Sequence, residues 1–381
     1  MKRLLFVANG HGETAIAARI AEEIEQLADG PFELDLFPLV GVGAGGGPLV
    51  LVGPRAAMPS GGLVAMGNMR AFARDLRGGF LALLARQIAF LMSRRGRYDA
   101  VVAVGDAYAL ALGFLVRAPA AFVGTAKSVY VAPYGPFERT LLRRAKLAFV
   151  RDEPTAQRLR GQGVAARAPG NVIVDLVRNE TIVDLPAATI AVFPGSRAEA
   201  YGDGVRLARV VRALGALRPG MRGLFSIAPT LDAARFARAL EHDGWTIAAG
   251  DGARAFAATS GGAEMLAWSG PLGALLRAST IVLGQAGTAN EQAAAFGLPV
   301  IALGGPGDRE EWYRMRQRRL LGDALAVVPD DPQRAAAAID ALLRDAGKLE
   351  SMRAAGRERM GGSGGVAAVA RALATLVEQT E

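Results

Sequence analysis

Residue types that often carry chemistry are scarce in this sequence. It contains no cysteine and only two histidines, His11 and His242. The absence of cysteine excludes disulfides, thiolate metal sites and cysteine nucleophiles, and two histidines argue against a multi-histidine metal centre. Aromatic residues make up only 6% of the chain, and no nucleic-acid motif or alternation of aromatic and basic residues occurs. Nucleic acid is therefore not an expected partner.

Long hydrophobic runs are missing as well. A membrane-spanning helix needs about 20 consecutive apolar residues. The nearest segment, 78–93, is shorter and is interrupted by Arg86 and Gln87, so it could lie on a membrane but should not cross one. The N-terminus has too few apolar residues before Asn9 for a signal peptide and is expected to form a first strand.

Length and hydropathy predict two α/β domains. The chain of 381 residues is longer than a single hydrophobic core usually organises, so we expect two domains. Because 51% of the residues are hydrophobic and 21% charged, disorder is excluded as the main state. Short apolar runs alternate with helical patterns, as in parallel sheets with crossover helices. We expect two Rossmann-like doubly wound domains facing a cleft. The main predicted strands are 4–8, 100–104, 120–123, 147–151, 189–193, 224–228, 280–283, 299–303 and 324–328.

The domain boundaries follow from a loss of periodicity in the middle of the chain. Residues 1–170 form the expected N-terminal domain, 171–188 a linker, and 189–360 the C-terminal domain. A glycine cluster opens the last segment, 361–381, whose helix we expect to pack back on the N-terminal domain. Ligands of such folds bind where parallel strands end, so the loops after strands are the places to search.

The net charge of +8 is concentrated in the first half. Residues 1–170 hold 21 basic and 13 acidic side chains, whereas 171–381 hold 23 of each. Within the first half, 54–97 contains eight arginines and one acid, Asp75. This asymmetry fits an anionic partner such as a membrane surface or a phosphorylated substrate. The alternative is that arginine is simply abundant throughout the chain.

Two loops after predicted strands have the composition of an anion site. In the first, Gly195 permits close backbone approach while Ser196 and Arg197 offer donors to a phosphate. An ordinary turn with an exposed arginine is the alternative. In the second, small residues precede a helix in which Thr288 and Asn290 can act as caps. The carboxylate of Glu291, in the first turn of that helix, can accept hydrogen bonds from a ribose diol. The alternative is that it only stabilises the helix dipole. The second loop contributes Gln285, Gly287, Thr288, Asn290 and Glu291 as candidates.

The two loops together carry a family resemblance. The motif PGSR, followed some ninety residues later by GQAGTANEQAAAFGLPVI, resembles the donor half of two-domain nucleotide-sugar glycosyltransferases similar to lipid-A-disaccharide synthase. This resemblance implies that the two Rossmann-like domains form a fold of the GT-B type. Residues 9–13 and 58–62 look like segments of synthase-related proteins of unassigned substrate. The synthase pattern A-G-E-x-S-G-D is replaced here by ANGHGETA, which keeps the glutamate but not the serine and aspartate.

The resemblance implies an inverting transfer of a sugar from a UDP-sugar to a lipid-linked acceptor. Asp106 matches the proposed catalytic base of the synthase, with His11 and Glu13 as the second and third candidates. Their structural alternatives are helix capping, phosphate contact and dipole stabilisation. On the donor side, Ser196 and Arg197 would hold the diphosphate without a cofactor or metal ion, which fits the absence of a D-x-D pair. Gly287 and Thr288 would approach the phosphates or the sugar, and Asn290 and Glu291 the sugar and ribose.

The arginine-rich stretch 54–97 then gains a predicted purpose. Apolar residues from Phe72 to Leu91 recur at helical spacing with arginines between them, which suits a helix in a lipid headgroup region. A core-facing helix with a basic outer face is the alternative. We therefore expect a cytoplasmic protein, peripheral on the inner face of the cytoplasmic membrane. A nucleotide-sugar epimerase or hydrolase, or a non-catalytic nucleotide-sugar-binding membrane accessory protein, are the alternative functions.

Overall fold

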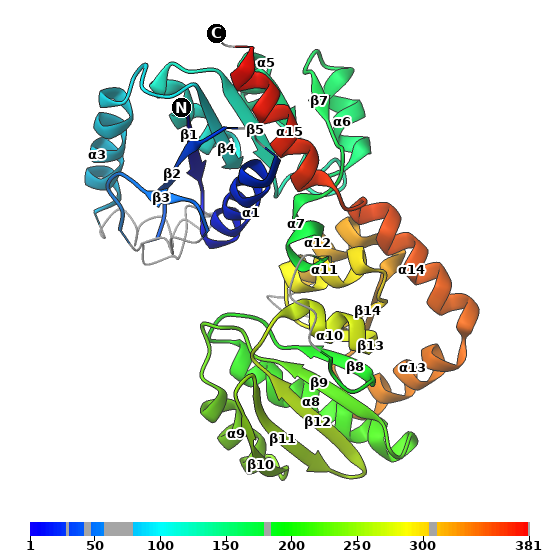
Figure 1. The fold of residues 1–381 in the computed structure, drawn as a ribbon. Helices are drawn as coiled ribbons and strands as arrows, with labels where there is room; N and C mark the ends of the chain where they lie inside the picture. The colour runs from blue at the N-terminus through cyan, green and yellow to red at the C-terminus, as the bar shows by residue number, and fades with distance from the viewer. Residues whose placement is uncertain (28–29, 42–46, 57–78, 179–183, 305–310, 380–381) are drawn as a thin grey trace. The chain divides into compact units, whose positions relative to one another are not determined.

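The computed structural model divides the chain into two compact units, each built on its own sheet (Figure 1). Unit 1 comprises Met1–Leu176 and Gly362–Glu381, and unit 2 comprises Val177–Gly361. The two-unit α/β architecture is the predicted fold class. The structure describes residues 1–27, 30–41, 47–56, 79–178, 184–304 and 311–379.

Unit 1 contains a seven-stranded parallel sheet in the order β3-β2-β1-β4-β5-β6-β7. The first strand has neighbours on both sides, because the chain crosses over first to β2 and later to β4. This reversal is the topological switch point at which ligands of open α/β sheets bind. The strands are β1 Lys2–Ala8, β2 Phe32–Pro38, β3 Val50–Leu51, β4 Ala100–Gly105, β5 Ala120–Gly124, β6 Leu147–Phe149 and β7 Ala166–Arg167.

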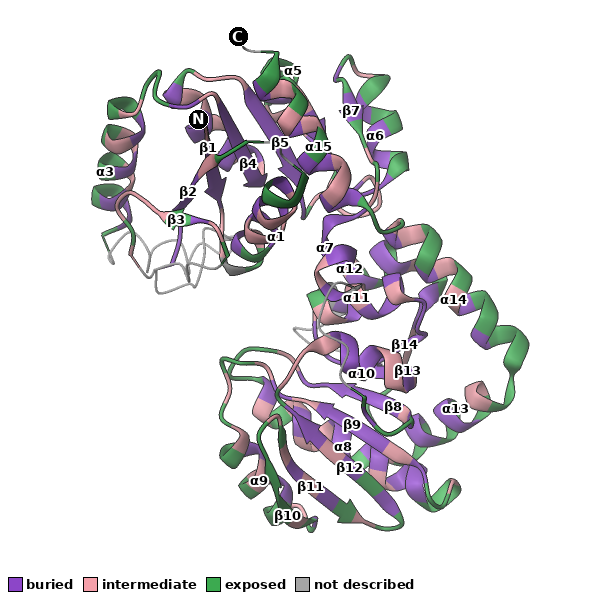
Figure 2. Cartoon of the chain, viewed as in Figure 1, coloured by how far each residue is buried: buried purple, intermediate pink, exposed green. Residues whose placement is uncertain are grey.

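Helices cover both faces of this sheet, and the buried strands separate them (Figure 2). One face packs against α3, α4, α5 and α6, and the other against α1, α7 and α15. The bounds are α1 His11–Leu27, α3 Phe80–Ser93, α4 Ala107–Gly113, η1 Phe114–Val116, α5 Pro136–Arg144, α6 Glu153–Arg160, α7 Val172–Arg178 and α15 Gly365–Glu378.

The segment predicted as a linker contains a helix instead. Residues 172–178 form α7, whose Val172 and Ile173 are buried in the core of unit 1. The Asp175 carboxylate accepts hydrogen bonds from the backbone N–H of Gly364 and of Val366, both at 2.8 Å. These bonds fix the start of α15, which packs along α1 through a shared apolar core. The C-terminal helix is thus an integral part of unit 1.

Unit 2 contains an eight-stranded sheet in the order β10-β11-β12-β9-β8-β13-β14-β15. Along the sheet from β12 through β9, β8, β13 and β14 to β15, neighbouring strands are parallel. The other two pairs, β10 with β11 and β11 with β12, are antiparallel. The sequence did not predict β10, β11 or β12. The strands are β8 Ala188–Phe193, β9 Arg222–Ser226, β10 Thr246–Asp251, β11 Arg254–Ser260, β12 Ala263–Trp268, β13 Ser279–Gly284, β14 Val300–Gly304 and β15 Leu325–Pro329.

Helices of unit 2 enclose a core that includes Phe225 and Phe236, whose rings meet edge to face with centroids 5.2 Å apart. The longest of them, α8, buries an apolar stripe that includes Leu207 and Leu214. The helices are α8 Ala200–Leu217, α9 Ala233–His242, α10 Leu272–Ala278, α11 Thr288–Phe296, α12 Glu311–Leu321, η2 Gly322–Ala324, α13 Pro332–Arg344 and α14 Ala346–Met360.

One helical stretch, Ala346–Glu378, has the length and mean hydropathy of a membrane span. In the structure this stretch is two helices, because α14 ends at Met360 and α15 begins at Gly365. The second of them buries Val366, Val369 and Leu373 in unit 1. A buried core helix passes the same test of length and composition, so the stretch is weak evidence for a membrane span.

The arginine-rich stretch 54–97 is described only in part, because residues 57–78 lie outside the described part of the chain. Within the described part, Phe80–Ser93 forms α3, as the helical spacing predicts. The side chains of Phe80, Leu83 and Leu91 are buried against the sheet. The core-facing alternative therefore holds for this apolar stripe. Leu81 and Met92 lie on the other side of the helix and are 64% and 43% exposed.

Candidate functional site

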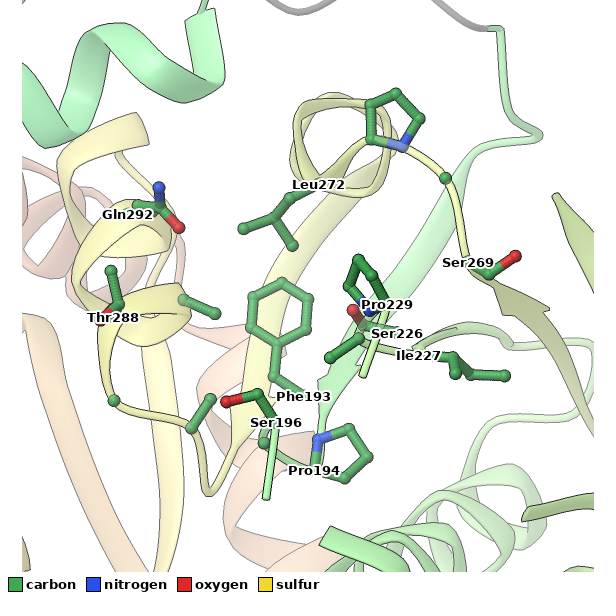
Figure 3. A pocket seen from close by; sticks show the side chains of 17 residues that line it. Phe193, Pro194, Ser196, Ser226, Ile227, Pro229, Ser269, Leu272, Thr288 and Gln292 are labelled. Carbon is green, nitrogen blue, oxygen red and sulfur yellow. The ribbon is translucent and has the colours of Figure 1, made fainter. Parts of the chain in front are cut away.

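A cavity of unit 2 lies where four neighbouring parallel strands end. Loops that follow β12, β9, β8 and β13 line a space of about 600 Å³ (Figure 3). Such an edge is where open α/β sheets bind ligands, as the strand pattern predicted. The cavity is lined by Phe193, Pro194, Gly195, Ser196, Ser226, Ile227, Ala228, Pro229, Ser269, Gly270, Pro271, Leu272, Ala286, Gly287, Thr288, Ala289 and Gln292.

The loop after β8 has the geometry of an anion-binding turn. Gly195 adopts φ +121°, a conformation that an L side chain rarely adopts, and the chain then enters α8 at Ala200. Ser196 and Arg197 are exposed in this loop. The Thr230 hydroxyl donates to the Ser196 carbonyl over 3.0 Å and so ties the loop to the segment after β9. The backbone thus holds Ser196 at the first cavity, and Arg197 follows it in the same exposed loop.

The loop after β13 lies beside the first loop. The Gln285 backbone N–H donates to the Phe193 carbonyl at 2.9 Å, and its side-chain amide donates to Leu303 at 3.3 Å. The next helix, α11, begins with Gly287 at its N-cap and no side-chain cap. The predicted capping by Thr288 and Asn290 is therefore wrong. The uncapped backbone N–H groups at this helix start can serve an anionic ligand instead.

A second, smaller cavity adjoins the first. Its volume is about 350 Å³, and the two cavities share Pro194, Gly195, Ser196, Ala286, Gly287 and Thr288. The second is more polar, because Arg197, Gln285 and the buried Arg314 contribute to it. Six of the eight predicted donor-site residues thus line one or both cavities: Gly195, Ser196, Arg197, Gln285, Gly287 and Thr288.

The other two predicted donor-site residues lie elsewhere. Asn290 is fully buried, and its side-chain amide donates to the Gly284 carbonyl at 3.0 Å. It therefore faces back toward the end of β13 and fixes the turn, which corrects the predicted contact with a sugar. Glu291 is half-buried in the first turn of α11 and lines neither cavity. Its predicted contact with a ribose stays a prediction.

Sequence reasoning missed several lining residues. Segments 226–229 and 269–272 match no motif, although both follow strands and contain proline or glycine. The strand-end rule did not find them, because the strand before 269–272 was not predicted and residues 226–228 fell inside the predicted strand 224–228. Gln292, Asp203 and Arg314 come from helices, one or more turns beyond the loops, where no local pattern marks them.

The floor of the first cavity is apolar and its rim is polar. Phe193 is 1% exposed and Ile227 3% exposed, and Figure 3 shows the Phe193 ring and Leu272 projecting toward the middle of the pocket. Thr288 and Gln292 approach from α11, while Ser196 stands at the turn after β8. A flat apolar group with a charged extension fits this arrangement.

In unit 1, two of the three candidate bases lie at the switch point of the sheet. The Thr125 hydroxyl, after β5, donates to the Glu13 carboxylate of α1 at 3.2 Å. Gly105, at the end of β4, has φ +127°, and a Cβ there would lie 3.0 Å from Asn9 Cβ and 3.1 Å from Glu13 Cγ. Glycine therefore suits the end of β4, where the backbone has positive φ and lies close to Asn9 and Glu13.

Asp106 caps helix α4, which was the structural alternative to its predicted role as a base. Its Oδ1 accepts from the backbone N–H of Tyr108 at 2.9 Å and of Ala109 at 3.3 Å, so it caps α4. Burial, followed by the charge of Asp106, raises the pKa of Tyr108 to about 12. His11 begins α1, but its side chain lies outside the described part of the structure.

A buried polar group that the sequence analysis missed lies one strand further along. Arg151 and Asp152 follow β6 and are each 3% exposed. The Arg151 guanidinium donates to the Thr125 carbonyl at 3.4 Å, and Asp152 accepts from the Thr155 backbone at 2.8 Å and caps α6. Burial also raises the pKa of Tyr134, which packs nearby, above its usual range. The edge of the unit 1 sheet is therefore rich in titratable side chains.

Metal ligands are not gathered in the described residues. Within those ranges no group of three or more histidine, cysteine, aspartate or glutamate side chains is arranged to hold a metal ion.

No protein-family model matches the chain, and no curated protein matches its sequence. Solved structures do match its fold. A Listeria monocytogenes protein with a proposed UDP-N-acetylglucosamine 2-epimerase activity superposes with a TM-score of 0.65 at 15% identity, covering 100% of this chain and 98% of that one. MurG of Acinetobacter baumannii gives a TM-score of 0.56 at 13% identity, with both chains fully covered.

A plant protein extends this range of neighbours. UGT2 of Phytolacca americana, complexed with UDP-2fluoro-glucose and pterostilbene, gives a TM-score of 0.59 at 12% identity with both chains fully covered. At such low identities the likeness defines the fold alone. That fold is the two-domain GT-B type, with two Rossmann-like α/β units. The strand pattern predicted the two α/β units, and the family resemblance implied the GT-B type.

Proposed function

We propose that this protein is an inverting glycosyltransferase that takes a sugar from a UDP-sugar and transfers it to a lipid-linked acceptor. One observation carries the proposal: the cavity at the carboxyl edge of β12, β9, β8 and β13 combines an apolar floor with an anion-binding turn and an uncapped helix start. An aromatic base with a diphosphate extension has the matching chemistry.

In this proposal unit 2 binds the donor. The base stacks over the apolar floor near Phe193, and the diphosphate reaches the start of α11 beside Ser196 and Arg197. Helix N–H groups and a guanidinium offset the charge that develops on the departing diphosphate. We propose that these groups suffice without a metal ion or cofactor. Glu291 is the candidate for the ribose hydroxyls, from the first turn of the same helix.

Unit 1 supplies the acceptor side and the base. A carboxylate accepts the proton of the acceptor hydroxyl while its oxygen forms a bond to the anomeric carbon. The bond from that carbon to the diphosphate breaks on the opposite face, UDP leaves with the electron pair, and the anomeric configuration inverts. Asp106 remains the first candidate base through its second carboxylate oxygen, followed by His11 and Glu13.

The proposed lipid acceptor is supported by the charge distribution in unit 1. The helices α3, α4, α5 and α6 on one face of its sheet carry six arginines and two carboxylates. On the other face, α1, α7 and α15 carry three arginines and six carboxylates. On the basic face, the Phe137 side chain is 72% exposed and the Leu81 side chain is 64% exposed. Exposed apolar side chains among arginines suit an anionic lipid surface at the cytoplasmic side of the membrane.

The test is a turnover assay with a radiolabelled UDP-sugar in the presence and absence of membrane lipid extract. The proposal requires label in the lipid phase and stoichiometric release of UDP. Release of free sugar without lipid labelling would contradict transfer and indicate a hydrolase.

A UDP-sugar epimerase is the second candidate, because an epimerase-like structure is among the fold neighbours at TM-score 0.65. Proton NMR of a UDP-sugar incubated with the protein, without lipid, separates the two. A new anomeric signal from an epimer would favour this second candidate. Binding of UDP without any turnover would instead indicate an accessory protein that has lost catalysis.

Membrane contact is tested separately by flotation with liposomes that contain or lack phosphatidylglycerol. Binding that requires the anionic lipid and decreases with salt is expected for an arginine-rich surface. Equal flotation with neutral liposomes, or none with either, would contradict the proposed surface.

A further inference from the structure

Helix α12 presents a buried arginine to the donor site of unit 2. Arg314 is 5% exposed and lines the second cavity, whereas Arg318 and Arg319 on the same helix are exposed. A guanidinium can never be neutralised at physiological pH, so its burial is costly unless polar or anionic groups compensate. Its position beside an anion-binding turn points to a role in the site.

A glutamine fixes the orientation of this guanidinium. Gln317 is 4% exposed, and its side-chain N–H donates to the Ala286 carbonyl at 2.8 Å. Its side-chain oxygen accepts from Arg314 Nη1 at 3.1 Å. Ala286 belongs to the loop after β13 that both cavities share. The three groups therefore hold one edge of the guanidinium in a set position relative to Gly287 and the start of α11.

The other charged groups of the second cavity define what it can bind. Arg197 adds a second guanidinium, whereas Glu199 and Asp203 are the carboxylates. Asp203 forms an ion pair of 2.7 Å with Arg206 on its own helix, and Glu199 is exposed at the start of α8. Two arginines, the helix start and the Gly195 turn thus leave this cavity suited to an anion.

We propose that Arg314, positioned by Gln317, binds the phosphate of the donor that is distal to the nucleoside. The first cavity has the volume and apolar floor for the nucleoside. The two cavities meet along Ser196, Gly287 and Thr288, so a diphosphate that starts in the first extends into the second. The inference rests on the proposed donor site and deepens it: the second cavity distinguishes a nucleoside diphosphate from a monophosphate.

The experiment is calorimetry of the full chain with UDP and with UMP. In Arg314→Met, which keeps the length and apolar stem of the side chain, we expect affinity for UDP to fall about 10- to 100-fold, as for loss of a hydrogen-bonded charge. Affinity for UMP should change less than about 2-fold, because UMP lacks the distal phosphate. Arg318→Met, on the exposed side of the same helix, is the matched control and should bind both ligands as the unmodified chain does.

Two further variants keep the inference testable if Arg314→Met does not fold. Arg314→Lys retains the charge without the planar fork and should show a smaller loss that is again confined to UDP. Gln317→Ala leaves the guanidinium in place but unpositioned, and should also weaken UDP more than UMP.

The possible failures are distinguishable. Equal weakening of UDP and UMP, or no weakening of either in the folded variants, would overturn the role of Arg314 while leaving the donor site intact. Failure of the unmodified chain to bind either nucleotide would instead contradict the proposed function itself.

Discussion

The two units place different chemistry at the same edge of similar sheets. In unit 2 the strand ends are lined by small, apolar and hydroxyl side chains, with arginines near the rim and in α12. In unit 1 the corresponding edge carries Glu13, Asp106, Arg151 and Asp152, of which the last two are almost fully buried. The fold alone therefore does not set the chemistry. The residues at the strand ends do, and in the proposed function they assign donor binding to unit 2 and proton transfer to unit 1.

The distribution of charge follows the same division. The first half of the chain holds the whole net charge of +8, and the helices on one face of the unit 1 sheet carry more arginines than carboxylates. Unit 2 has ion pairs that balance its arginines locally, such as those of Asp243 with Arg209 and Arg212 at 2.7 and 2.8 Å. The following experiments test this comparison between unit 2, the proposed donor unit with locally balanced charges, and unit 1, the proposed acceptor unit with one basic helix face.

The largest expected effect comes from removing the proposed base of unit 1 while keeping its cap. Asp106→Asn should lower sugar transfer by about 10²- to 10⁴-fold, because asparagine still caps α4 but cannot accept the proton. UDP affinity and melting temperature should stay unchanged. Asp232→Asn, at the N-cap of α9 in unit 2, is the matched control. Undiminished transfer by Asp106→Asn would move the assignment to His11 or Glu13.

The next effect concerns the integrity of unit 1. Asp175→Ala removes two charge-assisted hydrogen bonds from the backbone N–H groups of Gly364 and Val366 at the start of α15, which should lower the free energy of unfolding by about 2–4 kcal/mol. Asp331→Ala, an exposed N-cap of α13 in unit 2, should cost about 1 kcal/mol. Urea unfolding measures both. Equal losses would contradict the view that α15 depends on Asp175 for its place in unit 1.

A smaller effect is expected at the donor site. Arg197→Ala should weaken UDP binding by about 10-fold, because the diphosphate loses one charged hydrogen-bond donor from an exposed loop. Calorimetry measures the change, and Arg238→Ala on the exposed side of α9 serves as the control. An affinity unaltered by Arg197→Ala would place the diphosphate away from the turn after β8.

The smallest effect is the loss of stability of unit 1 at alkaline pH. Burial raises the pKa of Tyr108 to about 12 from an ordinary value of 10, so the folded state favours the neutral phenol. Its stabilising contribution is complete below pH 10 and is lost as the pH rises toward 12. Tyr108→Phe should therefore show a shallower decline in melting temperature over that range. Parallel declines in both proteins would contradict this origin of the pH dependence.

Much of the fold could be predicted because the strands of a covered parallel sheet are nearly continuous apolar runs. The predicted strands 4–8 and 280–283 match β1 and β13 for this reason. The antiparallel strands were missed because β10 is largely exposed and rich in alanine. Their turns were nevertheless visible: Gly261 and Gly262 both have positive φ and join β11 to β12 in a two-residue hairpin.

The candidate site was less predictable where contacts are remote in sequence. Loop residues such as Ser196 and Gly287 follow strands directly, so their common edge could be inferred from the pattern alone. Asn290 was misassigned because its composition allows a ligand contact, while only the structure shows its amide bonded to Gly284. Arg314 was missed because nothing in its local sequence distinguishes it from the other arginines of α12.

Local periodicity and composition were enough to predict the two-unit α/β class, the places of the two candidate loops and the unequal charge of the two halves. Which side chains meet was set by tertiary packing. It joined α15 to unit 1 through Asp175, set Asp106 as a helix cap and buried Arg314 at the second cavity. Burial and hydrogen bonding depend on residues far apart along the chain, so no local pattern contains them.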